Sequence, residues 1–430
     1  MERSRRRYSG AHVFFNEELK MKNCVKLIAV SLCVFSILGC TNEIPMVNLG
    51  IDDVYVVERM KKVILHPEFP GQYEWSMPDA NGNDSIVSTE RDYIFVAENP
   101  GEYAIQLKIN DAKNPVTHKF TITVWEEQVA YSRYITQVYE YRPAPGQFIN
   151  TMPLYETGDT EEIMRTKAQE SISGKNDVMV SLGGFGGYIT FSFDHTVVNV
   201  AGRKDFKILG NAFYAAANPN PDAPTDGGSC EPGIVMVSLD RNGNGIPDDE
   251  WYELAGSEYY KPETVHQYEI TYYRPAPDKL PTPKPGTPFT DTTYVYWKDN
   301  QGADGYLTKN VYHRQDYYPE WTNAGQISFS GTKLADNAVD ESGNGSYFVQ
   351  YAYDWGYVDN HPNDQEDKIS FDIGWAVDKN GNKVQLPGVD FIRVYTGVNQ
   401  QCGWLGETST ELSRAEDLHI QETTILLPNP

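Results

Sequence analysis

The chain has 430 residues and a formal net charge of -24, from 60 acidic and 36 basic residues. This length leaves room for two or three domains, each with its own hydrophobic core. The acidic balance argues against a nucleic acid partner, because phosphate backbones are bound by clustered Lys and Arg. The 29 Tyr, 35 Gly and 26 Pro residues are typical of short strands joined by many turns. We therefore expect a mostly β protein.

A targeting segment lies near the start of the chain. Residues 21–40 combine a basic start, an apolar run too short to span a bilayer, and a small residue before Cys40. This segment resembles a bacterial lipoprotein signal peptide. The resemblance implies cleavage before Cys40 and lipid attachment there, which would anchor the protein in the outer membrane, at the cell surface. Residues 1–39 would then be an upstream extension and signal peptide with the natural start at Met21, and residues 40–50 a lipidated tether. A membrane-spanning anchor is the alternative.

Short apolar runs between turn signals follow, and they predict a small β-sandwich over residues 51–126. The runs are Val54–Val57, Val63–Leu65, Tyr73–Trp75, Tyr93–Val96, Tyr103–Ile109 and Phe120–Val124. Tyr73-x-Trp75, Pro100-Gly101-x-Tyr103 and Ile122-Thr-Val124 together resemble the immunoglobulin-like domain of the polycystic kidney disease (PKD) type. The resemblance implies that the tryptophan packs between two sheets, that the tyrosine after the Pro-Gly turn is in the core, and that this module is a spacer or interaction domain without catalysis.

Residues 131–430 are expected to form one large β-sandwich domain of jelly-roll type that binds the ligand. Its predicted helix is Thr160–Ile172, with Asp159 or Thr160 as the N-cap and Gly174 at its end. The run 378–382 is interpreted as a plain Asn-Gly hairpin.

Two short segments of this domain are alike, Tyr139–Pro145 and Tyr272–Pro277. A single short match is weak evidence for duplication, so we interpret them as two strand ends that turn at proline.

The glycine run Gly183–Gly187 invites comparison with a phosphate-binding loop. Such a loop requires a following Lys-Ser/Thr and a helix, whereas the strand-like segment Tyr188–Phe193 follows here. We therefore predict a strand corner whose glycines adopt positive φ, with Phe185 packed beneath it.

Several segments between residues 180 and 420 resemble a family of outer-surface lipoproteins of gut Bacteroidota. They are Gly187–Phe193, Val235–Ser238, Phe371–Val377, Val389–Tyr395, Gly403–Glu407 and Ala415–Leu418. Some members of that family are encoded beside outer-membrane uptake systems, including those for corrinoids. The resemblance implies a binding protein that hands its ligand to an outer-membrane transporter, and it transfers no ligand-binding residue to this chain.

The loop after Leu239 has the spacing of a calcium site. Its candidate ligands are Asp240, Asn242, Asn244, the Ile246 carbonyl, Asp248 and Glu250. Gly245 stands where a calcium loop bends sharply, but position 12 is Trp251 and no helical pattern precedes the loop, so it is not an EF-hand. The bidentate ligand would come from Asp249, Glu250 or Glu253. A solvent-exposed hairpin rich in turn formers is the alternative.

Two cysteines lie beyond the lipidation motif, Cys230 and Cys402. In an oxidising compartment they could form a disulfide, or they could be two buried free thiols, and spacing does not decide between these.

The sequence shows no Cys-His metal set, nucleophile elbow or Ser-His-Asp pattern, and His195 is interpreted as a strand-end residue rather than a base. Aromatic residues beside Gly, Asp and Asn are better candidates for function, because rings can form a platform for a sugar or a flat macrocycle. The candidates are Trp321, Tyr353, Trp355, Tyr357 and Trp404. For any one of these rings a place in the core is the competing interpretation.

These observations predict a calcium-stabilised, non-enzymatic surface lipoprotein that captures a glycan or a corrinoid such as vitamin B12 for a TonB-dependent transporter. One alternative is a glycoside hydrolase that uses paired carboxylates. Another is an adhesion or structural protein of the cell surface.

Overall fold

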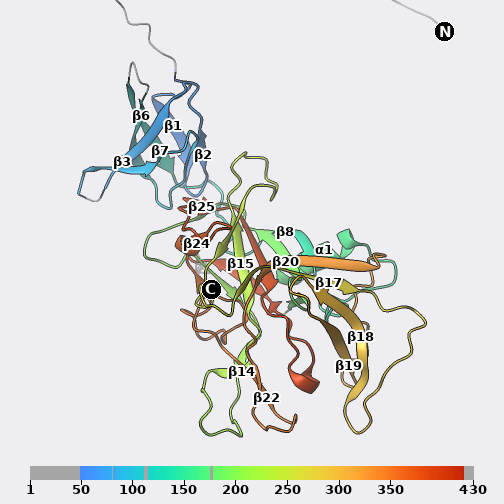
Figure 1. Cartoon of the computed structure of the whole chain (residues 1–430). Helices are drawn as coiled ribbons and strands as arrows, with labels where there is room; N and C mark the ends of the chain where they lie inside the picture. The colour runs from blue at the N-terminus through green and yellow to red at the C-terminus, as the bar shows by residue number, and fades with distance from the viewer. Residues whose placement is uncertain (1–48, 80, 111–114, 175–177, 421–430) are drawn as a thin grey trace, which may run out of the picture. The chain divides into compact units, whose positions relative to one another are not determined.

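The computed structural model describes residues 49–420 apart from 80, 111–114 and 175–177 (Figure 1). The predicted upstream extension, the signal peptide and the lipidated Cys40 lie outside the described residues, as does most of the tether. Within the described part, no helix is long and apolar enough to cross a membrane.

The first sheet is built only from residues 54–125. Its strands, in spatial order, are β1 (Val54–Glu58), β7 (Val116–Trp125), β6 (Gly101–Asn110), β3 (Gln72–Pro78) and β4 (Asp84–Ser88), with β1 parallel to β7. A separate pair joins β2 (Val63–Leu65) to β5 (Tyr93–Phe95). Both sheets contribute to one core, as expected for a small sandwich.

Trp75 is the centre of that core. Its side chain is fully buried, stacks on Tyr93 at 5.1 Å, and meets Phe120 edge to face. Its indole N–H donates to the Glu90 carbonyl at 2.9 Å, so the polar end of the ring is satisfied. The predicted role of this tryptophan is confirmed, while Tyr103 lies half-buried at the edge of the core against Phe95.

The remaining strands form several sheets, which confirms a mostly β fold. A six-stranded sheet runs β24 (Ala376–Val377), β16 (Trp251–Leu254), β15 (Gly233–Ser238), β26 (Phe391–Thr396), β10 (Tyr188–Ser192) and β8 (Gln137–Arg142). A four-stranded sheet runs β19 (Asp304–Asn310), β18 (Phe289–Asp299), β17 (Val265–Tyr273) and β20 (Gln326–Lys333). The six-stranded sheet contributes to two hydrophobic cores, one of which, with Ile234 and Tyr395, it shares with the four-stranded sheet.

Four smaller sheets complete the strand set. They are β23 (Ser370–Phe371) with β12 (Phe206–Leu209) and β28 (Arg414–Asp417); β13 (Phe213–Tyr214) with β14 (Gly227–Ser229), β22 (Phe348–Tyr351) and β21 (Ala338–Asp340); β11 (Val197–Val198) with β25 (Gly388–Val389); and β27 (Glu411–Leu412) with β9 (Val180–Ser181). Two short 3-10 helices, η1 (Ile373–Trp375) and η2 (Gly403–Leu405), lie between them in sequence.

The predicted helix is confirmed as α1 (Glu161–Ile172), which lies beside β8 (Figure 1). The Thr160 hydroxyl accepts from the Ile163 N–H and caps the first turn. Gly174, just past the end, has a φ of 64°, as a helix-terminating glycine does.

The glycine run forms the predicted corner before β10. Gly183 and Gly186 have φ values of 70° and 82°, and Phe185 is fully buried against Tyr268. Gly187 is needed for a different reason, because a Cβ there would lie 1.9 Å from the Leu182 carbonyl oxygen. The corner therefore depends both on left-handed backbone and on close backbone approach.

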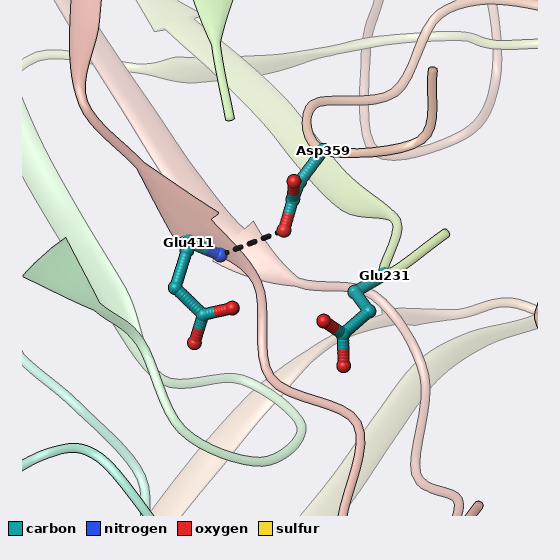
Figure 2. A group of neighbouring side chains, drawn as sticks. All are labelled: Glu231, Asp359 and Glu411. Atoms are coloured by element: carbon teal, nitrogen blue, oxygen red, sulfur yellow. Dashed lines mark hydrogen bonds between the residues drawn. The ribbon is translucent and has the colours of Figure 1, made fainter. Parts of the chain in front are cut away.

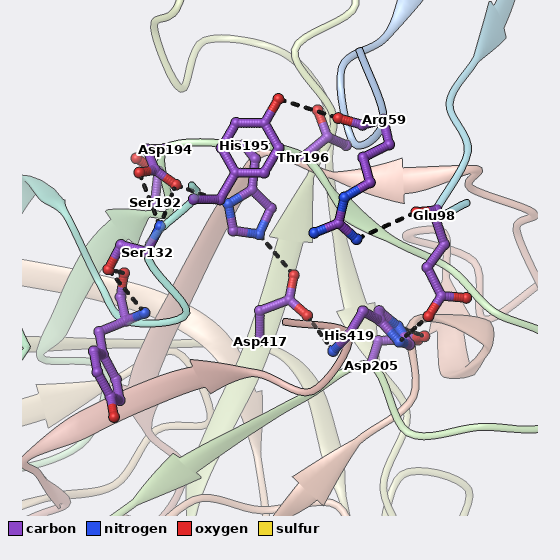
Figure 3. A network of polar contacts seen from close by, with 12 residues as sticks. Arg59, Glu98, Ser132, Ser192, Asp194, His195, Thr196, Asp205, Asp417 and His419 are labelled. Atoms are coloured by element: carbon purple, nitrogen blue, oxygen red, sulfur yellow. Dashed lines mark hydrogen bonds and ion pairs between the residues drawn. The ribbon is translucent and has the colours of Figure 1, made fainter. Parts of the chain in front are cut away.

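His195 lies between two carboxylates (Figure 3). Its side chain is fully buried, and its ring nitrogens lie 2.8 Å from Asp194 and 2.7 Å from Asp417. Burial lowers the pKa of His195, but the two hydrogen bonds outweigh it and the pKa is raised. The structure thus places His195 inside an ion-pair network rather than in an open site.

We expect Gly187→Ala to lower the free energy of unfolding by at least about 2 kcal/mol, because its Cβ meets backbone that cannot rotate away. Urea denaturation measures this. Gly325→Ala is the matched control, since a Cβ there meets nothing within 4 Å. Equal effects of the two substitutions would contradict this account of the corner.

Candidate functional site

A groove of about 650 Å³ lies at one end of the four-stranded sheet. We call it the tyrosine groove. It is lined by Arg274, Pro275, Ala276, Pro277, Lys279, Pro281, Thr290, Asp291, Tyr294, Lys309, Val311, Arg314, Asp316, Tyr318 and Glu320. Its volume falls within the range of small-molecule sites.

One wall of the groove forms where β17 ends. β17 stops at Tyr273, and the following Pro275 and Pro277 cannot donate to a strand ladder. The interpretation of Tyr272–Pro277 as a strand end turning at proline is therefore confirmed.

The facing wall is the segment 316–320. The Asn150 side chain holds this segment through hydrogen bonds to the backbone of the segment. The Asn150 amide nitrogen donates to the carbonyls of Asp316 at 2.7 Å and Tyr318 at 3.0 Å. Its amide oxygen accepts from the Glu320 N–H at 3.1 Å. Because Asn150 is buried and satisfied on both sides, it fixes the course of this segment without contacting the groove side chains.

Cations lie over the tyrosine rings of the groove. The Arg274 guanidinium is 4.4 Å from the centre of the Tyr318 ring, and the Lys309 ammonium is 4.4 Å from that of Tyr294. The Tyr294 hydroxyl donates to Asp316 at 2.7 Å. The rings are thus fixed in place before any ligand arrives.

Burial changes the properties of two side chains of the groove, Tyr318 and Glu320. Tyr318 is 3% exposed, yet its hydroxyl has no hydrogen-bond partner among the residues that the structure describes. Burial raises the pKa of Tyr318 to about 12, so the hydroxyl keeps its proton. Burial and the nearby charge of Asp316 raise the pKa of Glu320.

A second groove of about 300 Å³ lies on the other side of this wall segment and includes the predicted Trp321. Trp321 is half-buried and stacks on Tyr141 at 6.1 Å. Arg142 and Pro143, from the segment Tyr139–Pro145, line it as well. The two similar segments noticed in the sequence therefore each end at a groove.

The other predicted aromatic residues do not join Trp321. Tyr357 is 1% exposed and packs in the core of the four-stranded sheet, so its prediction as a ligand-binding residue is wrong. Tyr353 packs against Tyr357 and donates to the Ala335 carbonyl. Both rings pack with apolar residues that are distant in the sequence. A local sequence window does not reveal such packing.

Trp355 and Trp404 are half-buried in separate places. Trp355 contacts Trp375 at 4.6 Å, and Trp404 contacts Tyr312, which is 62% exposed, at 5.6 Å. The five candidate rings therefore do not lie together in one place.

Three buried carboxyl groups meet elsewhere in the large domain (Figure 2). Glu231, Asp359 and Glu411 each place an oxygen within 4.8 Å of the other two, and among the described residues they are the one group of three or more acidic, His or Cys side chains that does so. Asp359 accepts from the N–H groups of Asn211, Ala212 and Glu411.

The pKa values of these three carboxyl groups are all raised. Burial, with mutual repulsion, raises the pKa of Asp359 to about 8, and burial raises that of Glu231 to about 7. Burial, Glu231 and Asp359 raise the pKa of Glu411. Such a set can release protons when the protein unfolds or when a cation binds. No signal in the sequence pointed to it, because its members lie 52 to 180 positions apart.

The predicted calcium loop wraps around Asp240. The Asp240 carboxylate accepts from the N–H groups of Gly243 at 2.8 Å and Gly245 at 3.1 Å, and Lys62 lies 3.1 Å away. The Asn242 and Asn244 amides both donate to Asp248.

The side chains of three of the six predicted calcium ligands, Asn242, Asn244 and Asp248, thus contact one another. The Ile246 carbonyl accepts from the Asp248 N–H at 2.8 Å. Glu250 instead accepts from the Tyr252 hydroxyl at 2.8 Å and is turned away from the loop.

Cys230 and Cys402 are both buried and free, so the disulfide is not formed and the free-thiol interpretation holds. Burial raises the pKa of each thiol to about 12, which keeps both protonated and unreactive.

Comparisons with known proteins add little to this geometry. No protein-family profile matches the chain, and no curated protein matches it significantly. A solved structure described as a SusE-like protein aligns with 84% of this chain and 95% of its own, at 10% identity and a TM-score of 0.22. Another, from work on promiscuous carbohydrate-binding modules of the β-sandwich superfamily, aligns over 85% and 93%, at 10% identity and a TM-score of 0.14. Scores this low leave both architecture and function to be argued from the chain itself.

We expect the free energy of unfolding, measured in EDTA, to fall as pH rises from 5 to 8. The raised pKa values mean that the native carboxyls are still protonated where the unfolded ones are ionised, so their stability is present at low pH and lost through about pH 7 to 8. Glu231→Gln removes one such group, and its profile is less steep by up to about 1.4 kcal/mol per pH unit. The exposed Glu263→Gln is the control. Parallel profiles for Glu231→Gln and the wild type would contradict the assignment.

Proposed function

We propose that this chain is a non-enzymatic, lipid-anchored binding protein of the bacterial outer surface, which holds a saccharide in the tyrosine groove and passes it to an outer-membrane transporter. The observation that carries the proposal is the groove itself, in which fixed tyrosine rings and several charged side chains converge in one hollow. The half-buried Tyr294 ring would accept the apolar face of a sugar, and charged groups would take up its hydroxyls.

The prearranged groups favour binding. Asn150, Arg274 and Lys309 fix the wall and the rings through contacts within the protein, so little side-chain freedom remains to be lost when a ligand enters. The second groove, with Trp321, extends the surface available to a longer saccharide. A corrinoid is the competing ligand, and the binding test below includes it.

The surface anchor rests on the sequence. The lipoprotein-like segment ending at Cys40 supports membrane attachment, and the acidic balance of the chain suits a soluble ectodomain. Transfer of the ligand to an outer-membrane transporter is a further part of the same proposal.

Calcium is part of the proposal as a stabilising ion of the loop 240–250. Asp240, Asn242, Asn244, Asp248 and the Ile246 carbonyl would supply the oxygen ligands that calcium prefers. Asp240 already gathers the loop amides, so the ion would reinforce an existing turn rather than create it.

A second function, glycoside hydrolysis, is favoured by one observation. The groove holds Asp316 and Glu320, and the raised pKa of Glu320 is the property of a general acid. Release of reducing ends from a bound glycan, lost in Glu320→Gln, would establish hydrolysis in place of simple capture.

The groove is tested by calorimetry of the full chain with a panel of oligosaccharides and cobalamin. Tyr294→Ala should weaken saccharide binding at least tenfold, because it removes a ring that faces the ligand. Tyr306→Ala is the control, since this ring is 41% exposed on β19 outside the groove. Thermal unfolding confirms that both variants are folded. Binding of cobalamin and of no saccharide, or an equal loss of saccharide affinity in both variants, would contradict the saccharide proposal.

The calcium loop is tested by the melting temperature with and without Ca²⁺. At about 100 times its dissociation constant, the ion should stabilise the protein by about 2.7 kcal/mol. Asp248→Asn should abolish this shift, whereas Asp378→Asn, in the plain turn where Asp378 accepts from Asn380 and Asn382, should keep it. A wild-type melting temperature indifferent to calcium would remove the ion from the proposal.

A further inference from the structure

The tyrosine groove has the opposite charge balance from the rest of the chain. Its lining holds four cationic side chains and three carboxylates, whereas the whole chain has 36 basic against 60 acidic residues. Two of the cations are matched inside the groove: Lys279 pairs with Asp291 at 2.6 Å, and Lys309 contacts Asp316 at 3.5 Å. The other two cations are arginines.

Neither arginine has an acidic partner. Among the described residues, no carboxylate oxygen lies within 4.0 Å of the guanidinium of Arg274 or Arg314. Arg274 donates to the carbonyls of Pro319, Thr322 and Ala324, and the exposed Arg314 donates only its Nε, to the Val311 carbonyl. Carbonyls orient a guanidinium but do not cancel its charge, so both remain able to pair with an oxyanion.

The Tyr318 hydroxyl is a second observation at the groove, independent of the charges. It is buried beneath Arg274 and lacks a partner among the described residues. An unsatisfied buried hydroxyl costs about 1 to 3 kcal/mol, and such groups in native structures call for an explanation. A ligand oxygen in the groove would supply the acceptor.

We infer that the ligand is an anionic saccharide, a chain of sugar rings that carry carboxylate or sulfate groups. This inference rests on the proposed function and names its ligand class. The oxyanion pairs with the free Nη groups of Arg314, Arg274 adds positive potential, and the Tyr318 hydroxyl donates to a sugar oxygen.

Glu320 is the carboxylate that opposes such a ligand. Its surroundings limit that opposition, because Arg274 and Lys309 lie near enough to act on its charge. Asp316 is already engaged by the Tyr294 hydroxyl and by Lys309. The net field met by a ligand is therefore set by the two unmatched arginines.

The test compares matched pairs of oligosaccharides by calorimetry with the full chain. The pairs are galacturonan with galactan, glucuronan with glucan, and mannuronan with mannan, and a sulfated galactan distinguishes sulfate from carboxylate. We expect at least one anionic member to bind ten times more tightly than its neutral partner. Arg314→Gln should remove most of this preference, and raising the salt concentration should reduce it. Lys379→Gln, which removes an exposed charge outside the groove, is the matched control.

Tyr318→Phe separates binding from folding. Because its hydroxyl has no partner within the part of the chain that the structure describes, the variant should unfold at the wild-type temperature or higher, yet bind the anionic saccharide about tenfold more weakly.

The outcomes are distinguishable. Equal affinity for neutral and charged partners, with Tyr294→Ala still disruptive, overturns the ligand class and leaves the proposed function standing. Equal losses in Arg314→Gln and Lys379→Gln overturn the arginine site. Binding of none of the pairs below about 1 mM overturns both proposals.

Discussion

The close backbone packing at the glycine corner is the constraint on which the rest of the large domain depends. The backbone at Gly183 and Gly187 lies so close to residues 144 and 182 that a Cβ would not fit. The chain that follows β8 can therefore cross the corner in direct contact with it. From there Gly146 donates its N–H to the Tyr317 carbonyl at 2.7 Å, and Asn150 holds the next residues of the same segment. A steric requirement at the start of β10 thereby fixes one wall of a groove formed by residues about 130 positions later.

The distribution of charge follows from the same packing. An acidic chain that gathers Glu231, Asp359 and Glu411 in its interior raises the pKa of all three, since no cationic side chain forms an ion pair with any of them among the described residues. Basic side chains are in short supply, and many are used in ion pairs such as Lys62 with Asp240. Arg274 and Arg314 are not used in this way, so within the groove they are the cations whose charge is left for a ligand.

Sequence reasoning succeeded where the governing chemistry is local. The cap at Thr160, the turn at Asp378 and the positive φ of Gly183 each depend on a few neighbouring residues, and each was predicted. The groove was not predicted, because Arg274 and Tyr318 meet only after strands far apart in sequence have paired. Tyr357 was misplaced for the same reason: its Gly- and Asp-containing neighbourhood suggested an exposed loop, while its burial is decided by the sheet beneath it. The two proline turns were the one signal available in the sequence, since each lies at a groove. They did not indicate which other residues would form the groove.

The way in which the groove wall is held also explains why its side chains are available for binding. Asn150 and Gly146 grip the segment 316–320 through its carbonyls and N–H groups alone. Tyr317 and Tyr318 also pack into the core, whereas Glu320 takes part in this hold through its N–H alone, so the Glu320 side chain is not required to keep the wall in place. Positions freed from structural duty in this way can change with the ligand while the corner and its hydrogen bonds stay fixed. The rigid scaffold thus lies in the glycines and Asn150, and on the proposed function selectivity would lie in the arginines and tyrosines that they present.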